Sequence, residues 1–97
     1  MKHISVLLEP TISSLNIKED GVYVDCTLGY AGHSSAILKR LKKGKLYAFD
    51  QDEEAIRYSD DILKNISSNY KIIYSNFKSI KEKLNEENVS KVDGIIY

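Results

Sequence analysis

The segment VYVDCTLGYAGHSSAILKRLKKGKLYAFDQD, residues 22–52, decides the fold that the sequence predicts. It begins with a run of β-forming residues at 22–25 and then turns at Gly29 and Gly32. A helix-like stretch follows, and a second apolar run ends on Asp50. A strand, a turn, a helix and a second strand in this order are typical of a βαβ unit with two parallel strands.

Two features of this segment indicate a nucleoside-binding site. A glycine turn that opens a helix can offer free backbone N–H groups to an anionic group. An acid at the tip of the next strand can accept hydrogen bonds from ribose hydroxyls. Gly29 precedes Asp50 by 21 residues, close to the ~20 expected of such units. The sequence therefore predicts an adenosine-containing cofactor.

Strand-like and helix-like patterns alternate along the rest of the chain. The predicted elements are a helix at 9–16, a strand at 22–26, a helix at 34–42 that Lys42, Lys43 and Gly44 close, a strand at 45–49, a helix capped by Asp52 with Ala55, Ile56, Ser59, Ile62, Leu63 and Ile66 on its inner face, a strand at 71–74, a helix at 77–84 and a strand at 92–97. This order predicts an α/β doubly wound fold with a parallel sheet. Such sheets need cover on both faces and usually more than four strands. We therefore expect residues 1–97 to be the N-terminal part of a larger catalytic domain, cut in its fourth strand.

The composition argues against several classes of protein. Lys+Arg and Asp+Glu both total 14, so this segment alone is not expected to bind nucleic acid strongly through its charge. No apolar run is long enough for a transmembrane helix, and no signal peptide is recognised, so the expected compartment is the cytoplasm. No metal-ligand spacing surrounds the single cysteine, Cys26. We interpret Cys26 as a small buried residue at a strand end rather than a catalytic thiol, and no metal site is predicted.

The turn DCTLGYAGHS, residues 25–34, lacks the full G-x-G-x-x-G dinucleotide fingerprint because it has only two glycines. Taken alone, it fits an ordinary strand-to-helix turn as well as a cofactor site. The acid on the next strand favours the cofactor site, because ligands of such sheets bind outside the carboxyl ends of the strands. Gly29, Gly32, Asp50 and Phe77 are all predicted to lie at that side.

Several polar and aromatic residues around this turn allow more than one role. His33 is interpreted as a cofactor contact in preference to a surface histidine bonded to a neighbouring carbonyl. Asp50 is preferred to Asp52 for the ribose, because the position of Asp52 suits an N-cap. Asp25 could hold the turn or reach the cofactor. Phe77 could cover an adenine ring or be a core residue at the start of a helix.

Six short sequence motifs follow one another along the chain. They are HISVLL at 3–8, NIKEDGVYVD at 16–25, TLGYAGHS at 27–34, AFDQD at 48–52, SNF at 75–77 and VDGII at 92–96. Through these motifs and their order, essentially all 97 residues resemble the bacterial 16S ribosomal RNA cytosine-N4 methyltransferase family.

The resemblance implies a class I S-adenosylmethionine-dependent methyltransferase with a Rossmann-like fold. In that family the turn and its histidine contact the cofactor, which here implies contacts from Ala31, Gly32 and His33. Asp50 would hold the ribose, and Phe77 would line the cofactor pocket. The family usually has glycine or alanine where Ala31 stands.

The resemblance also implies a reaction in which a cytosine exocyclic nitrogen attacks the sulfonium methyl group, after the base is exposed from its stack. The family continues past the fourth strand with an acidic segment beside the reacting amine and with parts that receive RNA. Because these 97 residues contain neither, they are expected to hold part of the cofactor site, to be inactive alone and to include no identified catalytic residue. The implied partner of the full-length protein is 16S ribosomal RNA in the small subunit. The isolated chain is expected to self-associate through its exposed fourth strand.

Two other interpretations remain open at this point. A nicotinamide-dependent oxidoreductase would share the βαβ unit and the ribose acid, although the missing third glycine and the pair His33-Ser34 argue against it. A non-enzymatic interaction domain with a relict fold is the second. Binding of S-adenosylhomocysteine or NAD to the full-length protein distinguishes the first from the methyltransferase, and unchanged cofactor binding by Asp50→Ala would favour the second.

Overall fold

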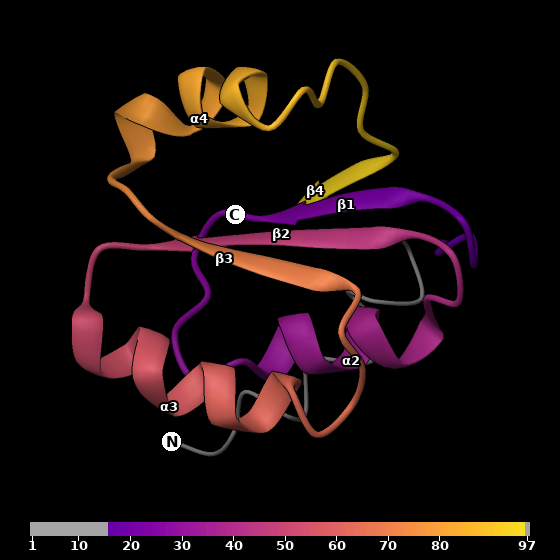
Figure 1. Ribbon diagram of the computed structural model, residues 1–97, viewed down its shortest axis with the longest axis horizontal. Helices are drawn as coiled ribbons and strands as arrows, with labels where there is room; N and C mark the ends of the chain where they lie inside the picture. Colours follow the sequence, from indigo (N-terminus) through magenta and orange to yellow (C-terminus); the bar gives the residue numbers. More distant parts are fainter. Residues whose placement is uncertain (1–15, 97) are drawn as a thin grey trace.

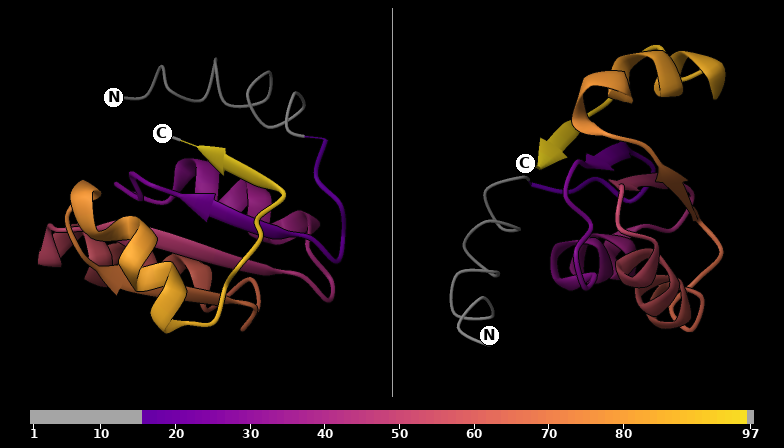
Figure 2. Two further views of the ribbon diagram at one scale, coloured as in Figure 1. Left: turned by 90° about the horizontal axis from the view of Figure 1, so that it is seen from above. Right: turned by 90° about the vertical axis from the view of Figure 1, so that its left-hand side faces the viewer.

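The computed structural model describes residues 16–96, apart from the side chain of Phe77, and its elements form three layers (Figure 1). A four-stranded sheet lies in the middle. Helices α2 and α3 cover one face of this sheet, while helix α4 covers the other (Figure 2). This is the layer arrangement expected when strands and helices alternate along a chain.

The elements follow one another as the sequence predicts, with ends that shift by a few residues. They are β1 (Val22–Asp25), α2 (Gly32–Arg40), β2 (Lys45–Asp50), α3 (Glu53–Leu63), β3 (Tyr70–Tyr74), the 3₁₀ helix η1 (Phe77–Ser79), α4 (Ile80–Glu86) and β4 (Gly94–Ile96). The helix predicted at 9–16 lies outside the described residues, apart from Asn16.

All strand pairs of the sheet are parallel, and the strand order is β3-β2-β1-β4. The central strands β1 and β2 are therefore covered on both faces, which explains their nearly continuous burial. The register sets Asp25 beside Ala48 and Asp50 beside Tyr74. Asp25 and Asp50 thus end neighbouring strands at the same edge of the sheet.

The core between the sheet and helices α2 and α3 is built from buried apolar side chains of the sheet, of both helices and of the turn between β1 and α2. They are Tyr23, Leu28, Ala31, Ala36, Ile37, Leu38, Leu41, Leu46, Ala48, Leu63 and Ile96. Burial of this much apolar surface is the main force that holds α2 and α3 on the sheet.

The opposite face of the sheet is covered less completely by the part of the chain that the structure describes. Val24, Cys26, Tyr47 and Phe49 are buried there. Helix α4 packs on them through half-buried side chains such as Ile80, and none of its residues is fully buried. Helix α4 is therefore held by less apolar burial than α2 and α3.

The predicted start of the helix after β2 is confirmed. The side chain of Asp52 accepts a hydrogen bond of 3.0 Å from the backbone N–H of Glu54. Glu53 and Glu54 place negative charge in the first turn of α3, where the helix dipole favours it. Ala55, Ser59 and Leu63 form the buried stripe of this helix.

The predicted role of Gly44 is wrong. Helix α2 ends at Arg40, and Leu41 is its C-cap in an extended conformation, so Gly44 does not close the helix. Instead, the backbone of Gly44 lies against that of Gly21, and a Cβ added to Gly44 would be 2.1 Å from the Gly21 carbonyl oxygen. The close approach of two backbones at the amino end of β1 and β2 explains this glycine.

We predict that Gly44→Ala lowers the free energy of unfolding by about 2 kcal/mol or more, because the new methyl group overlaps backbone that cannot move aside. Gly32→Ala is the matched control, since a Cβ there meets no atom within 4 Å. In urea unfolding, the free energy of unfolding of the control should fall only slightly or rise by up to ~1 kcal/mol. Equal stabilities of the two variants would contradict the close packing of Gly44.

Candidate functional site

The carboxyl ends of β1, β2 and β3 border a small hollow in the described surface. Its volume is about 150 Å³, and its lining residues are Cys26, Thr27, Asp50, Gln51, Ser75 and Asn76. The hollow therefore lies at the edge of the sheet where ligands of open parallel sheets bind.

The glycine turn beside this hollow has a conformation that most residues avoid. The N–H of Ala31 donates to the carbonyl of Leu28 at 2.9 Å, which closes a four-residue turn. Gly29, its second residue, has a φ of 55°, as turns of the primed types require. Ala31 also has a positive φ of 72° and is the N-cap of α2, at a cost of about 1 kcal/mol for a residue with a side chain.

Asp50 is bonded directly to this turn. One carboxylate oxygen accepts from the N–H of Gly29 at 2.9 Å, and the other accepts from the N–H of Asp52 at 3.0 Å. The structure thus brings together the turn and the acid that the sequence pairs. Because each carboxylate oxygen can accept about two hydrogen bonds, Asp50 keeps acceptor capacity for the hydroxyls of a ligand.

Asp25 holds the turn, which is one of the two roles that the sequence leaves open for it. Its side chain is buried and accepts from the N–H of Thr27 at 3.1 Å and from the hydroxyl of Ser34 at 2.7 Å. Burial raises the pKa of Asp25, and these two hydrogen bonds together with His33 oppose the rise. Neither of the two hydrogen-bond donors carries a charge, so a negative charge on Asp25 is costly to bury.

Ser59 is a site residue that the sequence interpretation did not assign. It is fully buried on α3, and its hydroxyl donates to the carbonyl of Gly29 at 2.8 Å. The sequence contains one indication of this contact, since a hydroxyl on the apolar face of a helix needs a partner when buried. The partner itself comes from a turn 30 residues away.

The first turn of α2 can accept an anionic group. Ala31, its N-cap, supplies no side-chain acceptor, and the turn has no acidic residue. The first N–H groups of the helix, including those of exposed Gly32 and half-buried His33, thus have no capping partner from the N-cap residue. Ala31, Gly32 and His33 follow directly on the turn that Asp50 holds, as the resemblance implies for a cofactor site.

Phe77 follows β3 at the start of η1. Its side chain lies outside what the structure describes, so its contact with a cofactor stays a prediction. Its neighbour Asn76 accepts a hydrogen bond from the N–H of Ser79 at 3.1 Å and so caps η1.

Cys26 is buried at the end of β1, as predicted. Burial, together with the charge of Asp25, raises the pKa of the Cys26 thiol, which makes it a poor nucleophile. Within residues 16–96, no three His, Cys, Asp or Glu side chains are grouped as a metal site would require. No helix in this part of the chain is both long and apolar enough to span a membrane.

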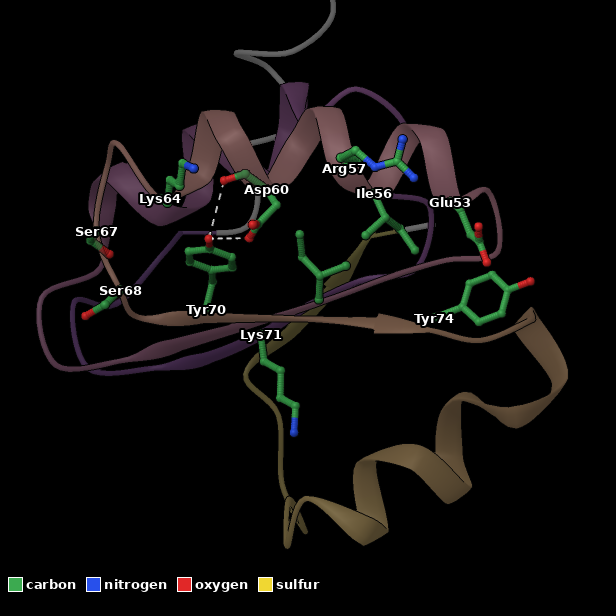
Figure 3. Close-up of a pocket in the computed structure, with 11 residues that line it drawn as sticks. Glu53, Ile56, Arg57, Asp60, Lys64, Ser67, Ser68, Tyr70, Lys71 and Tyr74 are labelled. Carbon is green, nitrogen blue, oxygen red and sulfur yellow. Dashed lines mark hydrogen bonds between the residues drawn. The ribbon is translucent and has the colours of Figure 1, made fainter.

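A larger hollow of the described surface lies elsewhere, along the outer edge of β3 (Figure 3). This groove of about 810 Å³ is lined by Glu53, Ile56, Arg57, Asp60, Lys64, Ser67, Ser68, Tyr70, Lys71, Ile72 and Tyr74. Across it, the Tyr70 hydroxyl donates to the Asp60 carboxylate at 2.6 Å. Burial and this hydrogen bond raise the pKa of Tyr70 to about 12. The groove contains none of the predicted site residues, so size alone does not identify the site.

The sequence comparisons agree on one family. A family model described as the MraW methylase family matches residues 1–97. The ribosomal RNA small subunit methyltransferase H 1 of Acholeplasma laidlawii is 60% identical over 97 residues, and the corresponding methyltransferase H of Mesoplasma florum is 56% identical over 96. These matches cover 100% and 99% of this chain but 32% and 31% of the relatives. The chain therefore spans about a third of the length of the curated relatives it matches.

Solved methyltransferases share the fold. An rRNA methylase from Streptococcus thermophilus is 25% identical with a TM-score of 0.59, and the match covers 84% of this chain and 46% of that one. A Streptococcus mutans methyltransferase in complex with S-adenosylhomocysteine is 26% identical with a TM-score of 0.61, over 84% and 45% of the two chains. Coclaurine N-methyltransferase, at 12% identity, has a TM-score of 0.65 over 74% and 22%. The predicted class I methyltransferase fold is confirmed.

We predict a pH dependence of stability that originates in Asp25. Because burial raises its pKa in the folded protein, the folded state binds more protons than the unfolded state between about pH 4 and the raised value. The contribution of Asp25 to the free energy of unfolding therefore falls as the pH rises through this window. Urea unfolding of the unmodified protein and of Asp25→Asn should show this as a stability difference that shifts in favour of the variant at higher pH.

Asp61→Asn is the control for this measurement, because Asp61 is an exposed acid paired with Lys64 on α3. Its stability difference from the unmodified protein should not move in the direction seen with Asp25→Asn. A pH-independent difference for Asp25→Asn would show that the burial of Asp25 does not perturb its titration.

Proposed function

This chain belongs to the MraW methylase family, and on that premise we propose that its protein is an S-adenosylmethionine-dependent methyltransferase. We propose cytosine N4 of 16S ribosomal RNA as the methylated group. The structural observation that best supports the cofactor is the hydrogen bond between Gly29 and Asp50. It joins an anion-binding turn to a ribose acid at the carboxyl ends of two parallel strands, where a nucleoside cofactor binds.

The residues present fit the proposed cofactor at both of its polar ends. Asp50 retains acceptor capacity for the ribose hydroxyls beyond its two backbone donors. The uncapped first turn of α2, with Gly32 and His33, suits the cofactor carboxylate. Phe77 is proposed to lie beside the adenine ring. When bound, S-adenosylmethionine supplies an electrophilic methyl group on a positively charged sulfur.

The substrate amine is a poor nucleophile, so the enzyme must align it with the methyl group and remove a proton. The residues described here bind and orient the methyl donor, and none is assigned to the proton transfer. We propose that the general base and the RNA-binding surface lie in the part of the protein that corresponds to the remaining two thirds of its relatives. Residues 1–97 would then be the N-terminal part of one catalytic domain and inactive alone.

The small ribosomal subunit is the proposed partner of the full-length protein, and the cytoplasm is the proposed compartment, because ribosomal RNA is modified where subunits are assembled. The curated relatives support this through their names, which specify the ribosomal RNA of the small subunit. The balanced charge of this chain, with 14 basic and 14 acidic residues, agrees with RNA contacts made mainly outside it.

The comparisons do not support the alternative of a nicotinamide-dependent oxidoreductase, since the relatives and solved structures that match are methyltransferases. Titration calorimetry of the full-length protein provides the direct test. We expect S-adenosylhomocysteine to bind and NAD to bind much more weakly. Preferential binding of NAD would refute the proposal.

We predict that Asp50→Asn weakens binding of S-adenosylhomocysteine by the full-length protein about tenfold to a hundredfold, the loss expected for hydrogen bonds to a charged acceptor. Asp61→Asn serves as the control, because Asp61 is an exposed acid on α3 and should leave the affinity unchanged. Calorimetric titration gives both dissociation constants. Unchanged affinity of Asp50→Asn would favour the non-enzymatic interaction domain.

We also propose that the isolated 97-residue chain self-associates through β4. Within the described residues, β4 pairs with β1 on one side only, and Ile95 is 40% exposed. An apolar strand edge of this kind is a template for pairing with another chain. Ile95→Lys should therefore give monomers in sedimentation experiments.

Tyr74→Lys is the control for this experiment, because Tyr74 is 60% exposed on the opposite edge strand β3. It should leave the association unchanged. A monodisperse monomer of the unmodified chain would contradict association through β4.

A further inference from the structure

The peptide group between Gly29 and Tyr30 is the central peptide of the turn that Leu28 and Ala31 close. Its carbonyl oxygen accepts the hydroxyl hydrogen bond of Ser59 at 2.8 Å. Ser59 is fully buried and Gly29 is half-buried, so the donor of this bond is shielded from water. The orientation of the central peptide is therefore held from the side of α3.

This orientation decides which polar group of the turn faces away from α3. Turns of types I′ and II′ share a positive φ at their second residue, and reversal of the central peptide converts one into the other with a change in the sign of φ at the third residue. Tyr30, the third residue, has no positive φ, as type II′ requires. In a trans peptide the N–H points opposite to the C=O. With the Gly29 carbonyl held by Ser59, the N–H of Tyr30 is directed away from α3. None of the hydrogen bonds found among the described residues uses this N–H.

The hydrogen bond from Ser59 completes a ring of contacts around Asp50, the residue proposed to bind the ribose. The N–H of Asp52 donates to one oxygen of Asp50, and the N–H of Gly29 donates to the other. Gly29 is held in turn by Ser59, which lies on the helix that Asp52 caps. Asp50, the glycine turn and α3 therefore form one closed network, and movement of any member disturbs the other two.

A second contact from α3 to the turn is of a different kind. The ring of Tyr58 packs edge-to-face with the ring of Tyr30, with centroids 5.2 Å apart. Both rings are exposed, at 53% and 68%. This pair can hold the side chain of Tyr30 near α3, but it does not determine the direction of the peptide. That direction is held by the hydrogen bond from Ser59 and favoured by Tyr30 itself, because a reversed peptide needs a positive φ at Tyr30.

We propose that Ser59 is a positioning residue for the cofactor. It holds the central peptide so that the Tyr30 N–H, together with the uncapped N–H groups of α2, is available to the carboxylate end of the cofactor. A flipped peptide would present the carbonyl oxygen instead, which repels a carboxylate. The inference rests on the proposed function, since it assumes that this turn binds S-adenosylmethionine.

Ser59→Ala in the full-length protein tests the inference. We expect S-adenosylhomocysteine to bind about fivefold more weakly in calorimetry, the loss typical of one neutral hydrogen bond. In a methyl-transfer assay on small ribosomal subunits, KM for the cofactor should rise while kcat at saturating cofactor stays unchanged. Ser90→Ala is the control, because Ser90 is an exposed loop residue between α4 and β4.

Ser59→Cys keeps a donor at this position, although the thiol is larger than the hydroxyl and is a weaker donor. Its affinity should lie between those of the unmodified protein and Ser59→Ala. The ¹⁵N–¹H resonance of Tyr30 provides a second measurement, and Ser59→Ala should shift it or accelerate its hydrogen exchange. A role limited to stability would lower the unfolding temperature of both variants and leave the affinity of the folded protein unchanged.

The inference is overturned if Ser59→Ala binds S-adenosylhomocysteine as tightly as the unmodified protein and the Tyr30 resonance does not change. Comparison with Asp50→Asn separates the role of Ser59 from the existence of the cofactor site. If Asp50→Asn weakens binding while Ser59→Ala does not, only the role of Ser59 is wrong. If neither variant weakens binding, the proposed cofactor site itself is wrong.

Discussion

The hydrogen bond from the Gly29 N–H to the Asp50 carboxylate joins the ends of β1 and β2, and the geometry of the whole crevice depends on it. Backbone pairing aligns the two strands, but pairing alone does not determine the path of the chain after β1. The carboxylate holds the turn at its second residue, next to the backbone bond of 3.0 Å from the Leu28 N–H to the Phe49 carbonyl. Helix α2 begins three residues later, at Gly32, so its first N–H groups are placed relative to the same acid.

The order of the elements could be predicted because apolar residues recur with the period of the element that buries them. The N-cap at Asp52 and the pairing of the turn with Asp50 are likewise short-range patterns, within a single βαβ unit. Each depends on residues whose spacing along the chain nearly determines their distance in space. The same reasoning placed Cys26 correctly in the core, because a small apolar residue at the end of a central strand is usually buried.

The roles of Gly44 and Ser59 could not be predicted, because each depends on a partner from another element. Gly44 at the end of a basic run looks like a helix terminus, yet its neighbour is the backbone of Gly21, across β1 and β2. Ser59 could be placed on the inner face of its helix, but its acceptor, the carbonyl of Gly29, lies on a turn 30 residues away. Asp25 was ambiguous for the same reason, since only the fold shows that Ser34 is within reach of its carboxylate.

The conformation of Ala31 limits how this site can vary among related sequences. Its φ of 72° favours glycine, whereas its 1% exposure inside the core leaves room for little more than a methyl group. Glycine satisfies the backbone and leaves a small void, and alanine fills the space at the cost of strain. Larger residues satisfy neither requirement. Glycine and alanine are therefore the residues that this backbone and this core are expected to accept at least cost.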